Sequence, residues 1–324
     1  MICDGCHISL NRHQSECDSI DRPTHCQSAR MNESPRLSSF DREAANRRGK
    51  MRFCVKFWGV RGSIACPGPG TARYGGNTPC LELRCGDQMI ILDGGTGLRP
   101  LGEALLSANV VVDADLFLTH CHLDHVAGLP FFTPLFEKGH QLRIWAGNLL
   151  PKFNLEQALR TMMAPPLFPI EVESFKAKIE CLDFRAGETI KRGGDVTLRT
   201  AMLNHPDGAT GYRVEYGGRV LAYITDTELP SGKIDAALLD LAREADLMIF
   251  DTTYTQAEIK HRRGWGHSTW QDGARLADAA GAKTFCLFHH DPSHDDAFMD
   301  AVAAEAKAAR PNTIVAREGA TVDL

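Results

Sequence analysis

The 324-residue sequence contains no long hydrophobic segment and no excess of basic residues. Its apolar runs, such as Leu247–Phe250, fall far short of the roughly 20 residues that a membrane-spanning helix needs. The N-terminal region also lacks the apolar stretch of a secretion signal, so we expect a cytoplasmic protein with no membrane partner. Lysine and arginine number 36 against 41 acidic residues, a net charge of −5, which weakens the case for a broad basic surface that binds nucleic acid.

Residues 1–50 contain few large apolar side chains, and these are scattered without a helix or strand period. A segment of this composition cannot bury enough apolar surface to fold, so we expect a disordered extension before a domain at residues 51–324. Cys3 and Cys6, with two later cysteines, offer thiols for a zinc ion, but their spacing is not that of a compact zinc site, and disorder is the favoured interpretation. The odd total of 11 cysteines fits reduced thiols better than a disulfide framework.

From residue 51 onward, β-type apolar runs alternate with helical patterns. The predicted strands are residues 52–58, 80–85, 88–92, 114–119, 141–146, 195–201, 211–216, 219–225, 246–250 and 284–288. The predicted helices are residues 97–107, 125–136, 153–163, 235–244, 268–280 and 295–309. Because strands dominate early and helices punctuate them, the pattern predicts an α/β fold of stacked sheets covered by helices.

Residues 147–176 combine an amphipathic helix with an apolar, proline-rich tail. An exposed apolar segment of this kind could form a lid over an active-site cleft or the contact surface of a homodimer. It could equally be an insertion that packs on the domain. The sequence leaves these interpretations open.

Histidine and aspartate residues follow four of the predicted strands. These candidates are His120, His122, Asp124, His125, His205, Asp226 and His289. Side chains at the carboxyl ends of strands in one sheet converge in space, so we expect them to form one site. His120 and His122, two apart in an extended segment, can share one metal ion, whereas Asp124 and His125 lie at the turn into a helix and can reach a second. Imidazole and carboxylate ligands suit zinc, iron or manganese.

This arrangement resembles the metallo-β-lactamase fold, with Asp93-Gly-Gly-Thr-Gly97 as its first motif and the histidine cluster as its second. The resemblance covers residues 51–324 and implies a four-layer αβ/βα sandwich, two mixed β-sheets flanked by helices, with two divalent metal ions in the cleft. Zinc is the favoured metal, with manganese or iron as alternatives. The resemblance implies that a first metal is held by His120, His122 and His205, and a second by Asp124, His125 and His289. It further implies that Asp226 bridges both metals and that Asp93 orients the cluster. His290 is a less favoured alternative to His289.

A further motif, Gly264-Trp-Gly-His267-Ser-Thr269, resembles the His-Ser-Thr element of the phosphodiesterase branch of this family, which includes tRNase Z and cyclic-nucleotide phosphodiesterases. Phe57–Ser63 and Tyr74–Thr78 resemble bacterial proteins of the cyclic-nucleotide type. The resemblance implies a hydrolase in which a hydroxide between the metals attacks phosphorus and His267 protonates the leaving oxygen as general acid, with Asp124 also in the catalytic set. The favoured substrate is a small anionic phosphodiester, a 3′,5′-cyclic nucleotide.

Other functions remain open. One is a tRNase Z-like RNA 3′-processing endonuclease with nucleic acid as its partner, although such enzymes usually carry a basic, glycine-rich arm and residues 147–176 hold few basic side chains. A thioesterase or lactonase of the same fold is another, and a non-hydrolytic sensing or redox protein is a third. Arg61 and Asn77 are interpreted as turn residues rather than phosphate contacts, and Cys121 is expected to face away from the metals.

Overall fold

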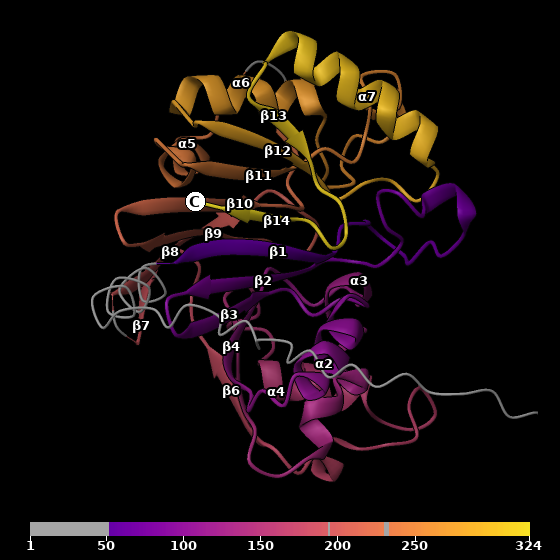
Figure 1. Cartoon of the computed structure of the whole chain (residues 1–324), viewed down its shortest axis with the longest axis vertical. Helices are drawn as coiled ribbons and strands as arrows, with labels where there is room; N and C mark the ends of the chain where they lie inside the picture. The colour runs from indigo at the N-terminus through magenta and orange to yellow at the C-terminus, as the bar shows by residue number, and fades with distance from the viewer. Residues whose placement is uncertain (1–51, 194, 230–232) are drawn as a thin grey trace, which may run out of the picture. The chain divides into compact units, whose positions relative to one another are not determined.

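Two mixed β-sheets form the centre of the structure (Figure 1). The computed structural model describes residues 52–193, 195–229 and 233–324. The strands of the first sheet are, in spatial order, β14 (Thr321–Asp323), β1 (Phe53–Gly59), β2 (Cys80–Cys85), β3 (Gln88–Leu92), β4 (Asp113–Leu118), β5 (Gln141–Ala146) and β6 (Lys178–Asp183). Those of the second are β13 (Thr313–Val315), β12 (Thr284–Phe288), β11 (Leu247–Asp251), β10 (Arg219–Ile224), β9 (Ala209–Tyr216), β8 (Val196–Leu203) and β7 (Thr189–Arg192). Neighbours from β3 to β6 and from β10 to β13 are parallel, and the other pairs are antiparallel.

Helices cover the outer face of each sheet. Helices α2 (Leu98–Ser107) and α4 (Leu155–Met162) share an apolar core with the first sheet. Helices α5 (Ala236–Ala242), α6 (Trp270–Ala280) and α7 (Asp296–Ala309) cover the face of the second sheet that points away from the first sheet (Figure 1). This helix–sheet–sheet–helix order confirms the predicted four-layer sandwich. In the described part of the chain, no helix is long and apolar enough to cross a membrane.

Aromatic rings join the inner faces of the two sheets. Phe57 of β1 lies 6.2 Å from Phe288 of β12, measured between ring centroids, and Phe117 of β4 lies 5.7 Å from Tyr212 of β9. Burial of a side chain of this size contributes about 1.5–3 kcal/mol relative to leaving it exposed. Tyr223 of β10 packs edge-on against Phe288 in the same core. These contacts fix how the strand ends of the two sheets face each other, and therefore the geometry of any site between them.

One predicted helix is wrong. In place of a helix over 125–136, the structure has α3 (Leu123–Val126), a single turn, followed by the short 3-10 helices Leu129–Phe131 and Thr133–Phe136. Pro130 and Pro134 sit at the starts of these two turns, where their missing N–H groups break a continuous helix. The strands β6, β7, β13 and β14 were not predicted, and the last three are short and lie at sheet edges. The predicted extension 1–50 lies outside the described residues.

The segment 147–176 packs on the first sheet. Helix α4 begins with a capping box between Asn154 and Gln157 and buries Leu155 and Leu159 in the apolar core there. Phe153 remains exposed on the loop that leads into the helix. The insertion thus has a packed face and an exposed face, and its role as lid or dimer surface stays a prediction.

Candidate metal centre

Three side chains of the centre leave strand ends in a left-handed backbone conformation. Asp93 follows β3, Asp226 lies two residues after β10 and His289 follows β12, with φ of 62°, 58° and 63°. Residues with a side chain rarely adopt this conformation, and it concentrates at functional sites. Each of these strands has a parallel neighbour, and each turn lies at the carboxyl end of its strand, where side chains of parallel neighbours meet.

Three histidines form one side of the centre. His120 and His122 follow β4, and His205 follows β8 from the other sheet. The ring centroids of His120 and His122 are 4.4 Å apart, and those of His120 and His205 are 4.8 Å apart. One nitrogen from each ring lies within 4.8 Å of the others, as three ligands of a single ion require.

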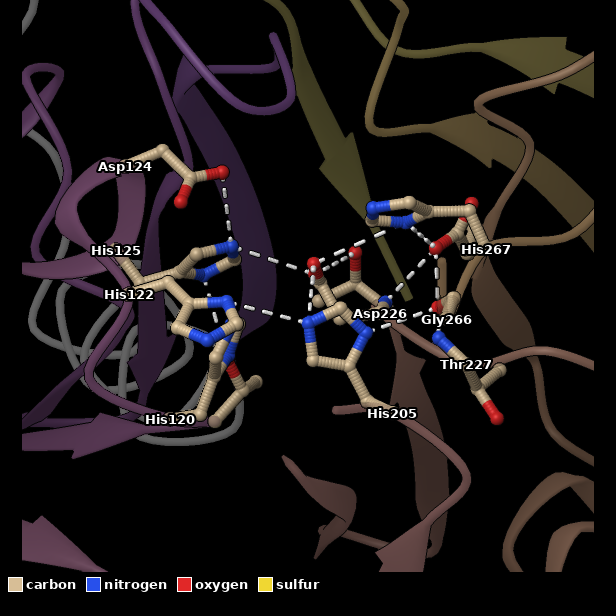
Figure 2. A network of polar contacts seen from close by, with 12 residues as sticks. His120, His122, Asp124, His125, His205, Asp226, Thr227, Gly266 and His267 are labelled. Atoms are coloured by element: carbon tan, nitrogen blue, oxygen red, sulfur yellow. Dashed lines mark hydrogen bonds and ion pairs between the residues drawn. The ribbon is translucent and has the colours of Figure 1, made fainter. Parts of the chain in front are cut away.

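Two carboxylates and two further histidines form the other side. His125 Nε2 lies 3.3 Å from one oxygen of Asp124 and 3.3 Å from one oxygen of Asp226. His289 Nε2 lies 3.4 Å from Asp124 and 3.3 Å from Asp226. Asp226 also lies 3.9 Å from His205 Nε2, so its carboxylate stands between the two groups (Figure 2).

The donors fit two divalent metal ions. The Nε2 atoms of His120, His125 and His289 are buried and have no hydrogen-bond partner within the described residues. Buried polar atoms are normally paired, and leaving one unpaired costs about 1–3 kcal/mol. Imidazole nitrogens and carboxylate oxygens are the ligand set of zinc and related ions. The structure thus brings together all seven predicted ligand residues in an arrangement that could hold two ions.

Asp93 holds two of these histidines from behind. Its buried carboxylate forms an ion pair with His125 Nδ1 at 2.9 Å and accepts a hydrogen bond from the Tyr223 hydroxyl at 2.8 Å. It also accepts from the Thr119 hydroxyl at 3.0 Å, and the Thr119 oxygen in turn lies 3.0 Å from His120 Nδ1. When Nδ1 carries the proton, the lone pair of Nε2 faces the centre, as a metal ligand requires.

Asp251 supports a histidine of the centre from the second sheet, as Asp93 does from the first. It was not among the residues predicted from the sequence. It ends β11 and is fully buried. The Thr253 hydroxyl donates to Asp251 at 2.8 Å, and the Thr253 oxygen lies 2.9 Å from His289 Nδ1. The position of Asp251 at the end of an apolar strand, like Asp226, is the feature of the sequence that could have identified it.

His205 is held by a glycine carbonyl. Its Nδ1 donates to the backbone oxygen of Gly266 at 3.0 Å. Gly266 has φ of +83°, and a Cβ atom there would lie 2.1 Å from the His205 ring. Glycine is therefore required at this position, immediately before His267.

His267 lies beside the centre with its ring against His289, at a centroid distance of 5.0 Å. Its Nδ1 donates to Asp251 at 2.8 Å and is 3.9 Å from Asp226. Burial lowers the pKa of His267, but Asp251, helped by Asp226 and Asp124, outweighs burial and raises the pKa to about 9. The imidazole is thus protonated at neutral pH.

The buried histidines and carboxylates of the centre shift each other's pKa values in opposite directions. Burial holds the pKa of His120 well below its usual value, so that ring is neutral. Burial acts in the same sense on His125, but Asp124, Asp226 and Asp93 outweigh it and raise the pKa of His125. The pKa values of Asp226 and Asp124 are lowered, because His125 and His289 outweigh burial. Both carboxylates are therefore ionised and available to a cation, which competes with the proton on His125.

Four other residues singled out in the sequence do not line the centre. His290 is buried, its Nε2 bonds the carbonyl of Ala316, and burial lowers its pKa to about 3, so His289 is the histidine that faces the centre. Arg61 donates to three backbone carbonyls and Asn77 to Glu318, as expected of turn residues. Cys121 packs against the core of the first sheet, and burial raises the pKa of its thiol to about 12.

A cleft of about 330 Å³ opens onto the centre. Its lining includes His122, Asp124, His205, Asp226 and His267. The side chain of His122 is 45% exposed, so the first group of histidines is accessible from the cleft. A reacting group in the cleft can therefore reach both groups of ligands and His267.

The comparisons agree with this geometry. The model of the "Beta-lactamase superfamily domain" matches residues 89–290, a range that includes Asp93 and all seven candidate ligands. The ribonuclease Z of Gemmatimonas aurantiaca is 24% identical over 265 residues, which cover 65% of this chain and 79% of that protein. Among solved structures, the short form of human tRNase Z has a TM-score of 0.59 at 19% identity, covering 83% of this chain and 98% of that chain. Zinc-bound PqqB from Methylobacterium extorquens has a TM-score of 0.62 at 17% identity, covering 84% and 100%.

These two structural likenesses concern the fold, because their sequence identities are low. The family model spans more than half of the chain and contains the whole candidate centre. The protein therefore belongs to the beta-lactamase superfamily.

Proposed function

We propose that this protein is a metal-dependent phosphodiesterase whose substrate is RNA. The observation that carries the proposal is the set of three buried histidine nitrogens that have no hydrogen-bond partner within the described residues and that face two ionised carboxylates beside a protonated His267. This donor set suits divalent metals, and a protonated imidazole next to it suits a leaving group that must take up a proton.

His120, His122 and His205 would hold one ion, and Asp124, His125 and His289 the other, with Asp226 between them. Zinc is the metal we favour for these ligands, with manganese or iron as alternatives. When bound, two such ions supply Lewis acidity toward a phosphoryl oxygen and lower the pKa of a water molecule.

His267 supplies the proton. In hydrolysis, a water oxygen forms a bond to phosphorus, the bond from phosphorus to the leaving oxygen breaks, and His267 donates a proton to that oxygen. The proton lost by the water leaves to solvent or returns to the ring. Asp251 fixes the ring through Nδ1, so Nε2 is the nitrogen left to donate to the substrate.

RNA is better supported as the substrate than a cyclic nucleotide, because the curated relatives include ribonuclease Z proteins that match most of their own length. The loop before His267 adds a physical reason. It carries Lys260, His261, Arg262 and Arg263, followed by Trp265, whose side chain is 57% exposed. The Arg262 guanidinium lies 5.2 Å from the Trp265 ring. Basic groups together with an exposed aromatic ring are typical of surfaces that bind single-stranded nucleic acid.

A substrate panel tests the proposal. Metal-loaded protein is incubated with a tRNA precursor that has a 3′ extension, with cyclic AMP and cyclic GMP, with bis-nitrophenyl phosphate and with a thioester. We expect cleavage of the precursor and of the nitrophenyl diester, and loss of both activities after chelation. Cleavage of the cyclic nucleotides without cleavage of RNA would favour the substrate suggested by the sequence. Cleavage of the thioester alone would overturn the phosphodiesterase proposal.

A further inference from the structure

A second cavity, of about 350 Å³, adjoins the metal centre. His120 and His122 form one of its walls, and His122 also lines the cleft described above. The other wall comes from the loop that follows β5 and from the exposed face of α4. The two spaces therefore meet at a side chain of the centre, and a molecule bound across His122 can occupy both.

An aromatic ring lines this cavity. Phe153 is 62% exposed, and it has no ring contact with another aromatic residue in the described part of the chain. Leu149 and Ala158 add apolar surface beside it. An exposed aromatic side chain in an apolar cavity next to a reacting centre is suited to stack on a planar ring.

Two amides on the same wall have free hydrogen-bonding capacity. Asn148 donates from Nδ2 to the Gly208 carbonyl at 3.0 Å, and its Oδ1 is buried without a partner within the described ranges. Gln157 accepts from the Asn154 backbone through Oε1 at 3.3 Å, and no hydrogen bond within those ranges uses its Nε2. The unpaired donor of Gln157 can pair with an acceptor on the edge of a nucleobase, whereas the buried oxygen of Asn148 is not exposed to the cavity.

The charged groups at this cavity are of opposite sign. Lys152 lines it and forms no ion pair with the described part of the protein. Asp207 lies on the His122 side, with 4.0 Å between its carboxylate and His122 Nε2. An ammonium group can attract the phosphate of a substrate, and a carboxylate can accept hydrogen bonds from sugar hydroxyls.

We propose that this cavity binds a nucleoside of the substrate, with its base stacked on Phe153. The inference rests on the proposed phosphodiesterase function. His267, which protonates the leaving oxygen, lies on the opposite side of Asp226 and His205 from His122 (Figure 2). The nucleoside in the cavity is therefore the one that keeps the phosphate after cleavage.

Two nitrophenyl diesters with the same leaving group test this assignment. Thymidine 5′-nitrophenyl phosphate places a nucleoside on the side that keeps the phosphate, and methyl nitrophenyl phosphate places a methyl group there. Stacking on an aromatic side chain contributes a factor of about 5 to 150 per base. We expect Phe153→Ala to reduce the ratio of kcat/KM between the two substrates by about that factor. Phe153→Trp keeps a stacking surface and is expected to preserve the ratio.

Phe131→Ala is the matched control, because Phe131 is also an exposed phenylalanine, at 51%, and does not line the cavity. It should leave the ratio unchanged. An unchanged ratio in Phe153→Ala, with both diesters still cleaved, would overturn the cavity assignment and leave the phosphodiesterase proposal standing. Cleavage of neither diester by the metal-loaded wild-type protein would instead overturn the proposed function.

Discussion

The carboxylate of Asp251 lies 2.8 Å from Nδ1 of His267, and both residues are buried at the edge of the histidine cluster. The same carboxylate accepts a hydrogen bond from the hydroxyl of Thr253, and the oxygen of that hydroxyl lies within hydrogen-bond distance of His289 Nδ1. A single buried acid thus connects the proposed proton donor with a proposed metal ligand. Variants of the centre can therefore affect proton transfer, metal binding or both, and the experiments below measure the two effects separately.

His267→Ala is expected to retain both metal ions and to lose proton transfer. General acid catalysis contributes about 10²–10⁴-fold, so cleavage of RNA, whose leaving alkoxide needs a proton, should fall by that order. A nitrophenyl diester leaves as a stabilised phenolate, so its cleavage should fall far less. Steady-state rates on the two substrates and elemental analysis of the variant make the comparison. Equal losses on both substrates, or loss of metal, would remove His267 from the role of acid.

Asp251→Asn is expected to move the pH dependence. Asp251 is the main group that raises the pKa of His267 to about 9 against the effect of burial. Without that charge the pKa falls, so the ring loses its proton at a lower pH. Since His267 acts in its protonated form, the alkaline decline of kcat/KM for RNA should shift to lower pH. Asp278→Asn, an exposed carboxylate on α6, is the control and should not move it. An unshifted profile in Asp251→Asn would contradict the assignment.

Much of the centre could be predicted because its ligands follow strand ends. His120, Asp226 and His289 each come directly after or close to a β-type apolar run, and parallel strands bring such positions to one edge of a sheet. That His120 comes from the first sheet, and Asp226 and His289 from the second, was not predicted. The position of Asp251 at the end of a β-type run could have marked it as a candidate, but neither its role nor that of Thr253 could be assigned from the sequence. Their roles depend on which side chain they face across neighbouring strands, and an isolated aspartate or threonine after a strand carries no such information.

The cavity beside the centre could not be predicted from the sequence either. Its walls come from a loop and helix around residue 153 and from the segment after β4, which are distant in the chain and meet only in the fold. The helix itself was predicted from its amphipathic pattern. In the structure, Leu155 and Leu159 form its buried face. The amphipathic pattern could not show that the exposed face stands beside His122.

Asp93→Asn is expected to weaken metal binding without removing any ligand. Asp93 orients His125 directly and His120 through Thr119. Loss of such a supporting contact behind a metal ligand typically lowers metal affinity by about 10–100-fold. Competition with a chromogenic chelator measures the affinity. Wild-type affinity in this variant would show that Asp93 does not orient the ligands.

Asp226→Ala is expected to reduce the occupancy of both ions, because this carboxylate lies within 3.9 Å of His205 on one side and 3.3 Å of His125 and His289 on the other. Asp207→Ala is the matched control. Its carboxylate lies 4.0 Å from His122 but is 89% exposed and outside the candidate ligand groups. Elemental analysis should find both ions in this control. Loss of a single ion in Asp226→Ala would show that the residue serves one ion and not both.

The metal content of the wild-type protein tests the central claim most directly. The protein is purified, supplemented in turn with zinc, manganese and iron, freed of unbound ions by gel filtration and analysed for metal per chain. Six ligand side chains in two groups of three, with the Asp226 carboxylate between the groups, predict about two divalent ions per chain. One ion or none per chain after supplementation with each metal would contradict the dinuclear centre.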